Sequence, residues 1–334
     1  MTTVHGEAAR RPANPDRVTL GVDLGGTGTR VVALGAGGTV LRHTSFRTAK
    51  ASGTALRELV GSLTEVSRDL DVAAAGIGVS GPVTAAGVVD NPSTLPAYTG
   101  LDLCREVGRA TTWPCVIDND AATAAIGEYT YGAGRGSRTC LAVTLGTGVG
   151  VGIIMDGRLL RAGDGTHPEA GHISVPDALR PCYCGLSRCW EQAASRIALE
   201  TITGAAPGAG PAAIATTARR GDRQAITSFE RYGQLVASGL GTLLTVFHPD
   251  RVVLGGSAAQ YFDLFADSLA AALDRVAPFQ WNPPIVAAEL GDVAGAVGAA
   301  VLARRPPLFS TAERHDKQHD NDAEQQTEDQ PGQG

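Results

Sequence analysis

The 334-residue chain lacks any long apolar run, and no stretch approaches the roughly 18 apolar residues that a membrane-spanning helix needs. Residues 1–16 are polar and interrupted by proline, and they lack the apolar segment of a secretion signal. We therefore expect a cytoplasmic protein with no membrane partner. In that compartment its six cysteines are expected to be reduced or bound to metal rather than paired as disulfides.

Concentrated positive charge is also lacking. The formal net charge is -6, and the 28 Lys and Arg residues form no basic run. This balance argues against nucleic acid or an anionic membrane as the main partner. Aromatic residues make up only 5% of the chain, whereas there are 43 glycines. Such a composition is typical of a globular protein with many tight turns and close backbone contacts.

Both ends of the chain lack apolar periodicity, so residues 1–16 and 305–334 are predicted to be disordered tails. Between them, short apolar strands alternate with helical patterns, which predicts an α/β fold. A strand at 18–24 leads into a glycine-rich turn and a returning strand, and the segment from residue 141 repeats this order. The two segments align residue for residue, which indicates a duplicated unit rather than a solenoid.

The duplication predicts a two-lobed actin-like (ribonuclease H-like) ATPase fold with a cleft between the lobes. We assign the N-terminal lobe to residues 17–122 and the C-terminal lobe to residues 123–291. A helix at 292–304 is expected to complete the N-terminal lobe. Within that lobe, the apolar spacing also predicts a third strand at 39–41 and a helix over 56–70.

Glycine-rich turns after three of the strands are candidates for binding phosphate or nucleotide. Backbone N–H groups there can approach phosphate oxygens because no Cβ intervenes. The candidates are Gly25, Gly26 and Thr27; Gly146, Thr147 and Gly148; and Gly255 and Gly256. Asp23, at the end of its strand, could orient Mg²⁺. A glycine hairpin alone is usually just a turn, and none matches the P-loop or dinucleotide spacing, but three such turns together favour ATP binding.

Residues 118–120, Asp-Asn-Asp, stand between a predicted strand at 115–117 and a predicted helix at 121–128. One of the three is expected to cap the helix, but three polar residues exceed what a cap needs. A phosphoryl-transfer enzyme needs a carboxylate to accept a hydroxyl proton, and a helix N-terminus would favour its ionised form. We therefore predict Asp120 as the catalytic base and Asn119 as a sugar ligand.

One histidine and three cysteines form an H-x9-C-x-C-x4-C pattern at 172–189, consisting of His172, Cys182, Cys184 and Cys189. Three thiolates and one imidazole suit a tetrahedral structural Zn²⁺ ion, although reduced, unliganded side chains are the alternative. The remaining cysteines stand in apolar or strand-like contexts and are predicted core residues: Cys104, Cys115 and Cys140. A zinc loop would also hold Glu169 and Glu191, which could accept hydrogen bonds from sugar hydroxyls, although a surface glutamate is the usual alternative.

These motifs together resemble the ROK family, named for repressors, open reading frames and kinases. The likeness runs from about residue 18 to residue 304. It is carried by Asp23-Leu24-Gly25-Gly26-Thr27, Asn119-Asp120-Ala121, the glycine run at 145–150, Glu169-Ala170-Gly171-His172, Cys182-Tyr183-Cys184-Gly185, Cys189-Trp190-Glu191 and Leu254-Gly255-Gly256.

The resemblance implies ATP and Mg²⁺ as cofactors, with Asp120 as the base. It also implies zinc at the four His and Cys residues. The sugar ligands that we expect on this basis are Asn119, Glu169, His172, Glu191 and Gly81. Family members are commonly dimers or tetramers, so a homodimer or homotetramer is expected.

The sequence departs from the family pattern at places that bear on the sugar. Ser93-Thr94-Leu95 stands where relatives often have Pro-Asn-Leu, so an asparagine contact is replaced. His167-Pro168-Glu169 is similar to fructokinase-like members, whereas the segment 189–192 is similar to glucokinase-like ones. We predict an ATP-dependent hexokinase that phosphorylates O6 of glucose or of a glucose-like sugar such as kanosamine.

The alternatives are a kinase for fructose, mannose or N-acetylmannosamine, and a glucokinase that uses polyphosphate. The acidic net charge argues mildly against a polyphosphate track. A further alternative is a sugar-binding regulator without catalysis. A repressor would need a DNA-binding module, and the 17 residues before Val18 have no helical pattern and are too short for a helix-turn-helix. We therefore expect an enzyme.

Overall fold

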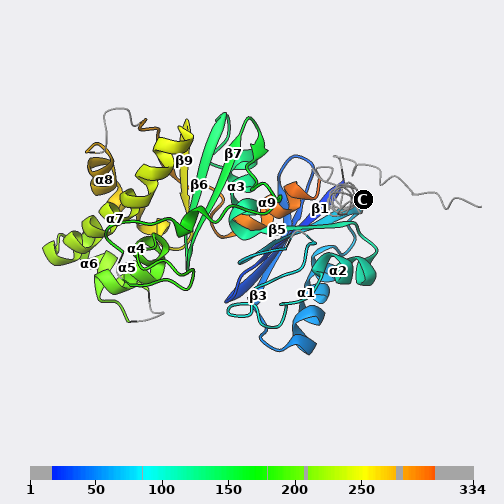
Figure 1. Cartoon of the computed structure of the whole chain (residues 1–334). Coiled ribbons are helices and arrows are strands. Elements are labelled where there is room, and N and C mark those ends of the chain that lie inside the picture. Colours follow the sequence, from blue (N-terminus) through cyan, green and yellow to red (C-terminus); the bar gives the residue numbers. More distant parts are fainter. Residues whose placement is uncertain (1–16, 85, 179, 207–209, 276–280, 305–334) are drawn as a thin grey trace, which may run out of the picture.

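The computed structural model describes residues 17–304 except 85, 179, 207–209 and 276–280. The predicted disordered tails, 1–16 and 305–334, lie outside the described residues. Within the described part, the strands form two five-stranded sheets (Figure 1). The strands are β1 (Val18–Leu24), β2 (Gly28–Leu34), β3 (Val40–Arg47), β4 (Val72–Val79), β5 (Cys115–Asn119), β6 (Thr139–Leu145), β7 (Val149–Met155), β8 (Arg158–Leu159), β9 (Arg251–Gly255) and β10 (Ile285–Ala287).

The two sheets have the same strand order. The first runs β3-β2-β1-β4-β5, and the second, taken from its other edge, runs β8-β7-β6-β9-β10. In each sheet three strands form an antiparallel meander, and the last two strands lie parallel to the first strand of the meander. The two sheets of equal strand order confirm the predicted duplicated, actin-like (ribonuclease H-like) α/β fold. Because β1, β4 and β5 are parallel, their carboxyl ends meet at one edge, where open sheets bind ligands.

The structure also confirms the residue-by-residue alignment of the two duplicated segments. Strands β1 and β6 end at Leu24 and Leu145, which are the two residues that the sequence alignment pairs. Each strand is followed by the same tight connection: the Gly25 N–H donates to the Gly28 carbonyl at 3.1 Å, and the Gly146 N–H to the Gly148 carbonyl at 2.9 Å. The two glycine turns are therefore structural equivalents.

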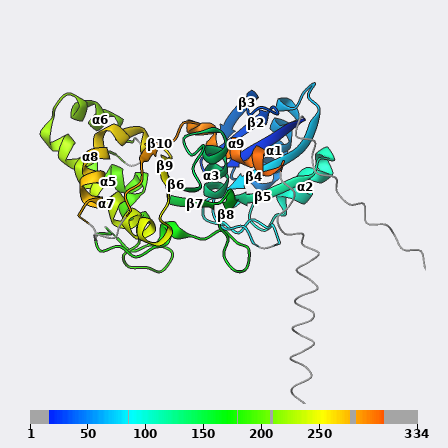
Figure 2. The same ribbon diagram turned by 90° about the horizontal axis from the view of Figure 1, so that it is seen from above.

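Helices surround and separate the sheets. The α-helices are α1 (Ser52–Val66), α2 (Leu103–Thr111), α3 (Asp120–Tyr131), α4 (Glu191–Ala194), α5 (Arg196–Thr203), α6 (Ala212–Arg219), α7 (Arg223–Phe247), α8 (Phe262–Leu273) and α9 (Ala294–Leu302), and short 3-10 turns are η1 (Ala170–His172), η2 (Ala259–Tyr261) and η3 (Gly291–Val293). Helices α3 and α9 lie between the two sheets, whereas α4 to α8 gather on the far side of the second sheet (Figures 1 and 2).

Glycines bring the two central helices into close contact with each other and with the first sheet. A Cβ on Gly298 of α9 would lie 1.6 Å from the Thr123 carbonyl oxygen of α3, and one on Gly21 of β1 would lie 1.8 Å from the Ala296 carbonyl oxygen. Any larger residue at either position would separate the elements. Thus α9 packs on the N-terminal sheet although it comes from the end of the described chain, and the lobe boundaries stay a prediction.

Three local expectations differ from the structure. The helix predicted over 56–70 spans Ser52–Val66 instead, and it cannot extend to residue 70 because Asp69 adopts a positive φ of 63°. The strand predicted at 39–41 is longer in the structure, where it runs from Val40 to Arg47. The added residues are mostly polar and partly exposed, so the apolar pattern used to predict strands did not include them. Cys140 is buried as predicted, but Cys104 and Cys115 are only half-buried. Among the described residues, no helix is both long and apolar enough to cross a bilayer.

Candidate active site

The predicted Asp-Asn-Asp triplet lies where β5 meets α3, and Asn119 is the residue that caps the helix. Its side-chain oxygen accepts hydrogen bonds from the N–H groups of Ala121 at 2.8 Å and Ala122 at 3.3 Å. The same side chain donates from its amide nitrogen to the Gly81 carbonyl oxygen at 3.3 Å. Asn119 and Gly81, two of the predicted sugar ligands, therefore lie together at the carboxyl edge of the first sheet.

Asp120, the first residue of α3, lies among other acidic groups. Burial, together with the negative charges of Asp23 and Glu169, raises the pKa of Asp120 to about 7, although hydrogen bonds from Ala121 and Ser80 act to lower it. The sequence suggested that the helix N-terminus would favour the ionised carboxylate, but burial and neighbouring carboxylates outweigh that effect. A pKa near 7 leaves a large ionised fraction at neutral pH, as a general base requires.

Asp23 occupies the end of β1, next to the first glycine turn. Burial raises its pKa to about 6, the Arg30 guanidinium lowers it, and Asp292 raises it. Arg30 lies 3.6 Å from the Asp23 carboxylate, too far for a strong hydrogen bond. A Cβ on Gly295 would lie 3.0 Å from the Asp23 carboxyl carbon, so this residue also borders the start of α9. The structure thus brings the predicted Mg²⁺-orienting residue close to the predicted base.

The backbone carbonyls of the first glycine turn are all directed toward the segment 48–50. The Thr48 hydroxyl donates to the Gly25 carbonyl at 2.6 Å, and the Thr48 N–H donates to the Thr27 carbonyl at 3.2 Å. The Lys50 ammonium donates to the Gly26 carbonyl at 2.6 Å. Because the carbonyl oxygens of the turn point toward residues 48–50, an anion on the opposite side of the turn would contact N–H groups rather than carbonyl oxygens.

The second and third glycine turns lie together in the other half of the molecule. Gly256 has a positive φ of 81°, and a Cβ there would lie 2.7 Å from the Leu145 backbone, directly before Gly146. The Ala258 N–H donates to the Leu145 carbonyl at 2.9 Å, which fixes this contact. The predicted nucleotide-binding residues at 146–148 and 255–256 therefore lie next to each other. Residue 256 must be glycine, because its φ is positive and because a Cβ would collide with the Leu145 backbone.

The four predicted metal ligands come together. One ligand atom from each of His172, Cys182, Cys184 and Cys189 lies within 4.8 Å of all the others. The His172 Nδ1 atom lies 3.3 Å from the Cys189 sulfur and 3.7 Å from the Cys182 sulfur. Three sulfurs and one imidazole nitrogen at such separations can bind a tetrahedral metal ion.

The remaining predicted sugar ligands adjoin this cluster. The other imidazole nitrogen of His172, Nε2, lies 3.8 Å from a Glu191 carboxylate oxygen and 3.0 Å from the Tyr183 hydroxyl. Glu191 is buried and accepts a hydrogen bond from the Val149 N–H at 3.3 Å. Glu169, one turn before His172, is exposed, so its carboxylate is open to a ligand. Together these groups offer hydrogen-bond acceptors to vicinal hydroxyls.

Sequence reasoning assigned no role to three residues that the structure places at the site. Arg161 forms an ion pair with Asp118, the first member of the triplet. Tyr183, between two of the metal ligands, contacts His172, and Lys50 supports the first glycine turn. A lone arginine or lysine in a loop carries no motif, so the sequence held no signal for these two, whereas Tyr183 could have been suggested by its place in the Cys-x-Cys segment.

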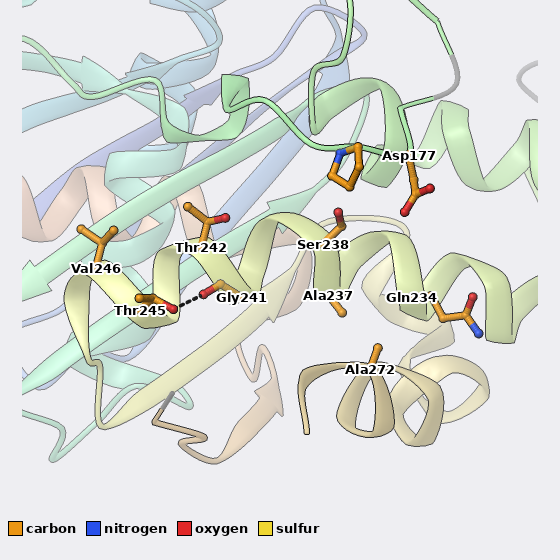
Figure 3. A pocket seen from close by; sticks show the side chains of 10 residues that line it. Asp177, Gln234, Ala237, Ser238, Gly241, Thr242, Thr245, Val246 and Ala272 are labelled. Carbon is orange, nitrogen blue, oxygen red and sulfur yellow. Dashed lines mark hydrogen bonds between the residues drawn. The ribbon is translucent and has the colours of Figure 1, made fainter. Parts of the chain in front are cut away.

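A separate surface pocket lies on the outer face of α7, away from these residues. Figure 3 shows its side chains along α7, facing the segment that carries Asp177 and the end of α8. Most of its lining residues belong to α7: Gln234, Ala237, Ser238, Gly241, Thr242, Thr245 and Val246. It contains none of the predicted catalytic, phosphate, sugar or metal residues, and we do not assign the reaction to it.

Comparison with known proteins gives a consistent result. Residues 19–306 match the family model of the ROK family. A glucokinase from Streptomyces coelicolor is 33% identical over 318 residues, which cover 86% of this chain and 98% of the relative. The crystal structure of a ROK family glucokinase from Streptomyces griseus, in complex with glucose and AMPPNP, has a TM-score of 0.75 and 32% identity, over 86% of this chain and all of that one.

A ROK family transcriptional regulator, a homologue of the E. coli MLC protein, has a TM-score of 0.73 at 24% identity, and at that level the likeness shows a shared fold alone. The family match over nearly all of the described chain and the glucokinase relatives confirm the predicted class of enzyme, a sugar phosphotransferase. This chain belongs to the ROK family.

Proposed function

We propose that this chain is an ATP-dependent hexokinase that transfers the γ-phosphate of ATP to a hydroxyl, expected to be O6, of glucose or a glucose-like sugar. The observation that carries this proposal is the position of Asp120. Its carboxylate lies near Asp23, which follows a strand into a phosphate-type turn, and near Glu169, which belongs to the sugar side. A group that accepts the hydroxyl proton must stand between donor and acceptor sites in this way.

In the proposed reaction, the enzyme's own residues align the sugar and accept a proton. Glu169, Glu191 and the Nε2 atom of His172 would hold the sugar hydroxyls, and Asn119 would contact the ring from the start of α3. Asp120, in its ionised form, would then take the proton from the attacking hydroxyl. In a loose phosphoryl-transfer transition state that transfer comes late, so alignment of the hydroxyl matters as much as basicity.

The residues at the end of β1 fit ATP with Mg²⁺. The N–H groups of Gly25 and Gly146 close the two turns. Those of Gly26 and Thr27 would face phosphate oxygens, and those of Thr147 and Gly148 would do so from the other half. Asp23 has a raised pKa and a distant counter-charge, so a nearby cation would stabilise its ionised form. When bound, Mg²⁺ would neutralise charge on the phosphates.

The His172 cluster fits zinc. Its donor atoms number three sulfurs and one nitrogen, the set that structural zinc sites use, and they already lie within 4.8 Å of one another. When bound, zinc would tie the segment around His172 to the segment that ends at Cys189. That would fix the positions of His172 and Glu191, so we propose a structural zinc ion rather than a catalytic one.

The substitution Asp120→Asn tests the assignment of the base. We expect the variant to fold and to bind sugar, but to lose about 10²- to 10⁴-fold in kcat, the usual contribution of a general base. Release of ADP with Mg-ATP is measured for both proteins with glucose, kanosamine, mannose, fructose and N-acetylmannosamine. A variant with near-normal kcat would remove Asp120 from the reaction.

The same variant has a second expected effect, on stability. The folded-state pKa of Asp120, about 7, lies above the ordinary aspartate value of 3.8, which applies in the unfolded chain. Stability is therefore greatest below the unfolded-state pKa and falls as pH rises through 7. Asp120→Asn removes this penalty, so at pH 8 its free energy of unfolding should exceed that of the wild-type protein by up to about 4 kcal/mol. The Tm of the variant should be correspondingly higher at pH 8, and the difference should vanish near pH 4.

Kanosamine is the second candidate substrate. Thr94, in the segment that departs from the family pattern, packs beside the first glycine turn, since a Cβ on Gly26 would lie 3.0 Å from the Thr94 Cβ. This placement supports an altered contact at the site. Activity with kanosamine above that with glucose would establish the amino sugar, and the other sugars of the panel test the remaining hexose alternatives.

No ADP release with any sugar would direct the test to polyphosphate as donor, and failure of that donor too would favour a non-catalytic regulator. We further propose that the enzyme works in the cytoplasm, where ATP is available, as a homodimer or homotetramer. Multi-angle light scattering of the purified chain measures that state.

A further inference from the structure

One ion pair joins the two halves of the molecule beside the candidate base. Arg161 follows β8, and both of its terminal nitrogens donate to the Asp118 carboxylate, one of them at 2.8 Å. The Arg161 side chain is 24% exposed and the Asp118 side chain only 7%. A bidentate pair that is largely removed from solvent fixes the relative positions of its two partners more closely than a surface ion pair does.

On one side, the pair is anchored directly to the residues of the proposed reaction. Asp118 is the penultimate residue of β5, and its carboxylate also accepts a hydrogen bond from the Asn119 N–H at 2.8 Å. Strand pairing with β4 places Asp118 opposite Gly78. A shift of the Asp118 carboxylate would therefore also move Asn119 and Asp120, the first residue of α3.

On the other side, the pair holds the segment 160–172, which connects β8 to η1. The Leu160 N–H donates to the Ile153 carbonyl of β7 at 2.8 Å, and a tight turn follows, closed by the Ala162 N–H and the Thr166 carbonyl at 3.0 Å. Glu169 and His172 come at the end of this segment. Arg161 thus lies at its start and reaches across to the N-terminal sheet.

The neighbouring imidazole does not compete with Arg161 for Asp118. Burial lowers the pKa of His167 to about 4, with Asp118 and Arg161 acting on it in opposite directions. His167 is therefore neutral at physiological pH, and its Nδ1 atom is buried with no hydrogen-bond partner. The guanidinium of Arg161 is the cation that faces the Asp118 carboxylate.

We propose that Arg161 is a positioning residue, which binds Asp118 to hold the sugar-binding Glu169 in place relative to the base Asp120. The proposal rests on the proposed function. Sugar held by the segment 160–172 must present its hydroxyl to a carboxylate of the other half of the molecule. Misplacement by about 1 Å at such a junction can cost about 10²-fold in turnover.

The test uses the full chain with Arg161→Met, Asp118→Asn and the double variant, and Arg219→Met as matched control. Arg219 makes a bidentate pair with Asp263 at 2.8 Å for both bonds, but between α6 and α8, and both side chains are about half-exposed. We expect Arg161→Met to raise the KM for sugar about tenfold and to lower kcat about tenfold, with little change in the KM for ATP. The control should change none of these constants.

The double variant separates positioning from stability. Arg161→Met alone leaves a buried, unpaired carboxylate and should lower Tm, whereas adding Asp118→Asn removes that charge and should restore much of the Tm. The sugar KM should stay raised in the double variant. If Tm and sugar KM recover together, or if Arg161→Met behaves like the control, the pair is merely structural and the proposal is wrong.

A readout without turnover keeps this test separate from the proposed function. Hydrogen exchange of peptides covering 160–172 is compared in the same variants. We expect exchange at least about tenfold faster in Arg161→Met and in the double variant, and unchanged exchange in Arg219→Met. Unchanged exchange in the Arg161 variants would overturn the proposal even if the wild-type chain phosphorylated no sugar, and faster exchange would support it in that case too.

Discussion

The two glycine turns have the same backbone but different surroundings. Both follow the first strand of a meander, and both are closed by an equivalent hydrogen bond. The first turn is preceded by the acidic Asp23, whereas the equivalent residue before the second turn is Thr144. Behind the first turn lie Thr48 and Lys50, which occupy its carbonyls, whereas Glu191 lies against the second turn at Gly148.

This difference suits the two copies of the duplicated unit to different functions at one site. The first copy combines a carboxylate with a turn whose carbonyls face backward, which suits phosphates and a cation. The second copy lacks a carboxylate at the equivalent position of its strand. Its turn lies against Glu191, which in turn lies 3.7 Å from the sulfur of Cys182 in the predicted metal cluster. We infer that the first turn serves the phosphates and that the second also positions the sugar side.

Matched substitutions at the equivalent positions before the turns should give the largest contrast. Asp23→Asn removes the charge that would orient Mg²⁺, and we expect kcat to fall about 100-fold. Thr144→Ala removes a hydroxyl that donates only weakly, at 3.4 Å to the Gly150 carbonyl, and kcat should change less than about threefold. Steady-state ADP release measures both. Equal losses at the two positions would show that the copies have not specialised.

Alanine in the two turns should give an intermediate contrast. A Cβ on Gly148 would lie 2.4 Å from a Glu191 carboxylate oxygen, so Gly148→Ala must displace Glu191 and should raise the sugar KM about tenfold. A Cβ on Gly26 would meet Thr94 at 3.0 Å instead. Gly26→Ala should therefore act mainly on the KM for ATP, raising it about threefold. A raised sugar KM from Gly26→Ala, with none from Gly148→Ala, would reverse the assignment.

The sequence allowed the duplication, and most of the residues that gather at the candidate site, to be identified because the relevant signals are local. Each glycine turn follows an apolar strand, and the histidine and cysteines of the metal cluster stand close together in the chain. Asn119 and Asp120 were identified by their place between a strand and a helix. In each case the residue types and their spacing specify the geometry without knowledge of distant contacts.

The features that the sequence did not reveal depend on contacts between distant segments. The raised pKa of Asp120 arises from burial and from Asp23 and Glu169, which join it only in the folded chain. The pairing of Arg161 with Asp118 spans 43 positions and follows no periodic pattern. The central contact of α3 with α9 relies on glycines whose role is visible only when the helices cross.

Substitution of Lys50 is expected to have a small effect, but it most directly tests how the first turn is supported. Its ammonium donates to the Gly26 carbonyl at 2.6 Å and to the Thr94 carbonyl at 2.7 Å, so it joins the turn to the segment that borders it. Lys50→Met removes both bonds and a positive charge near the phosphates. Because the side chain is exposed, the fold should be retained, and we expect the KM for ATP to rise about three- to fivefold with kcat little changed.

Lys50→Arg serves as the control, since it keeps the charge while changing the hydrogen-bond geometry. If charge dominates, Lys50→Arg should behave like the wild-type protein, and the effect of Lys50→Met should shrink as salt is added. If the two carbonyl bonds dominate, both variants should raise the KM for ATP, independently of salt. An unchanged KM for ATP in both variants would mean that Thr48 alone directs the carbonyls of the turn, and the difference between the two turns would then depend on Asp23 rather than on the segment behind it.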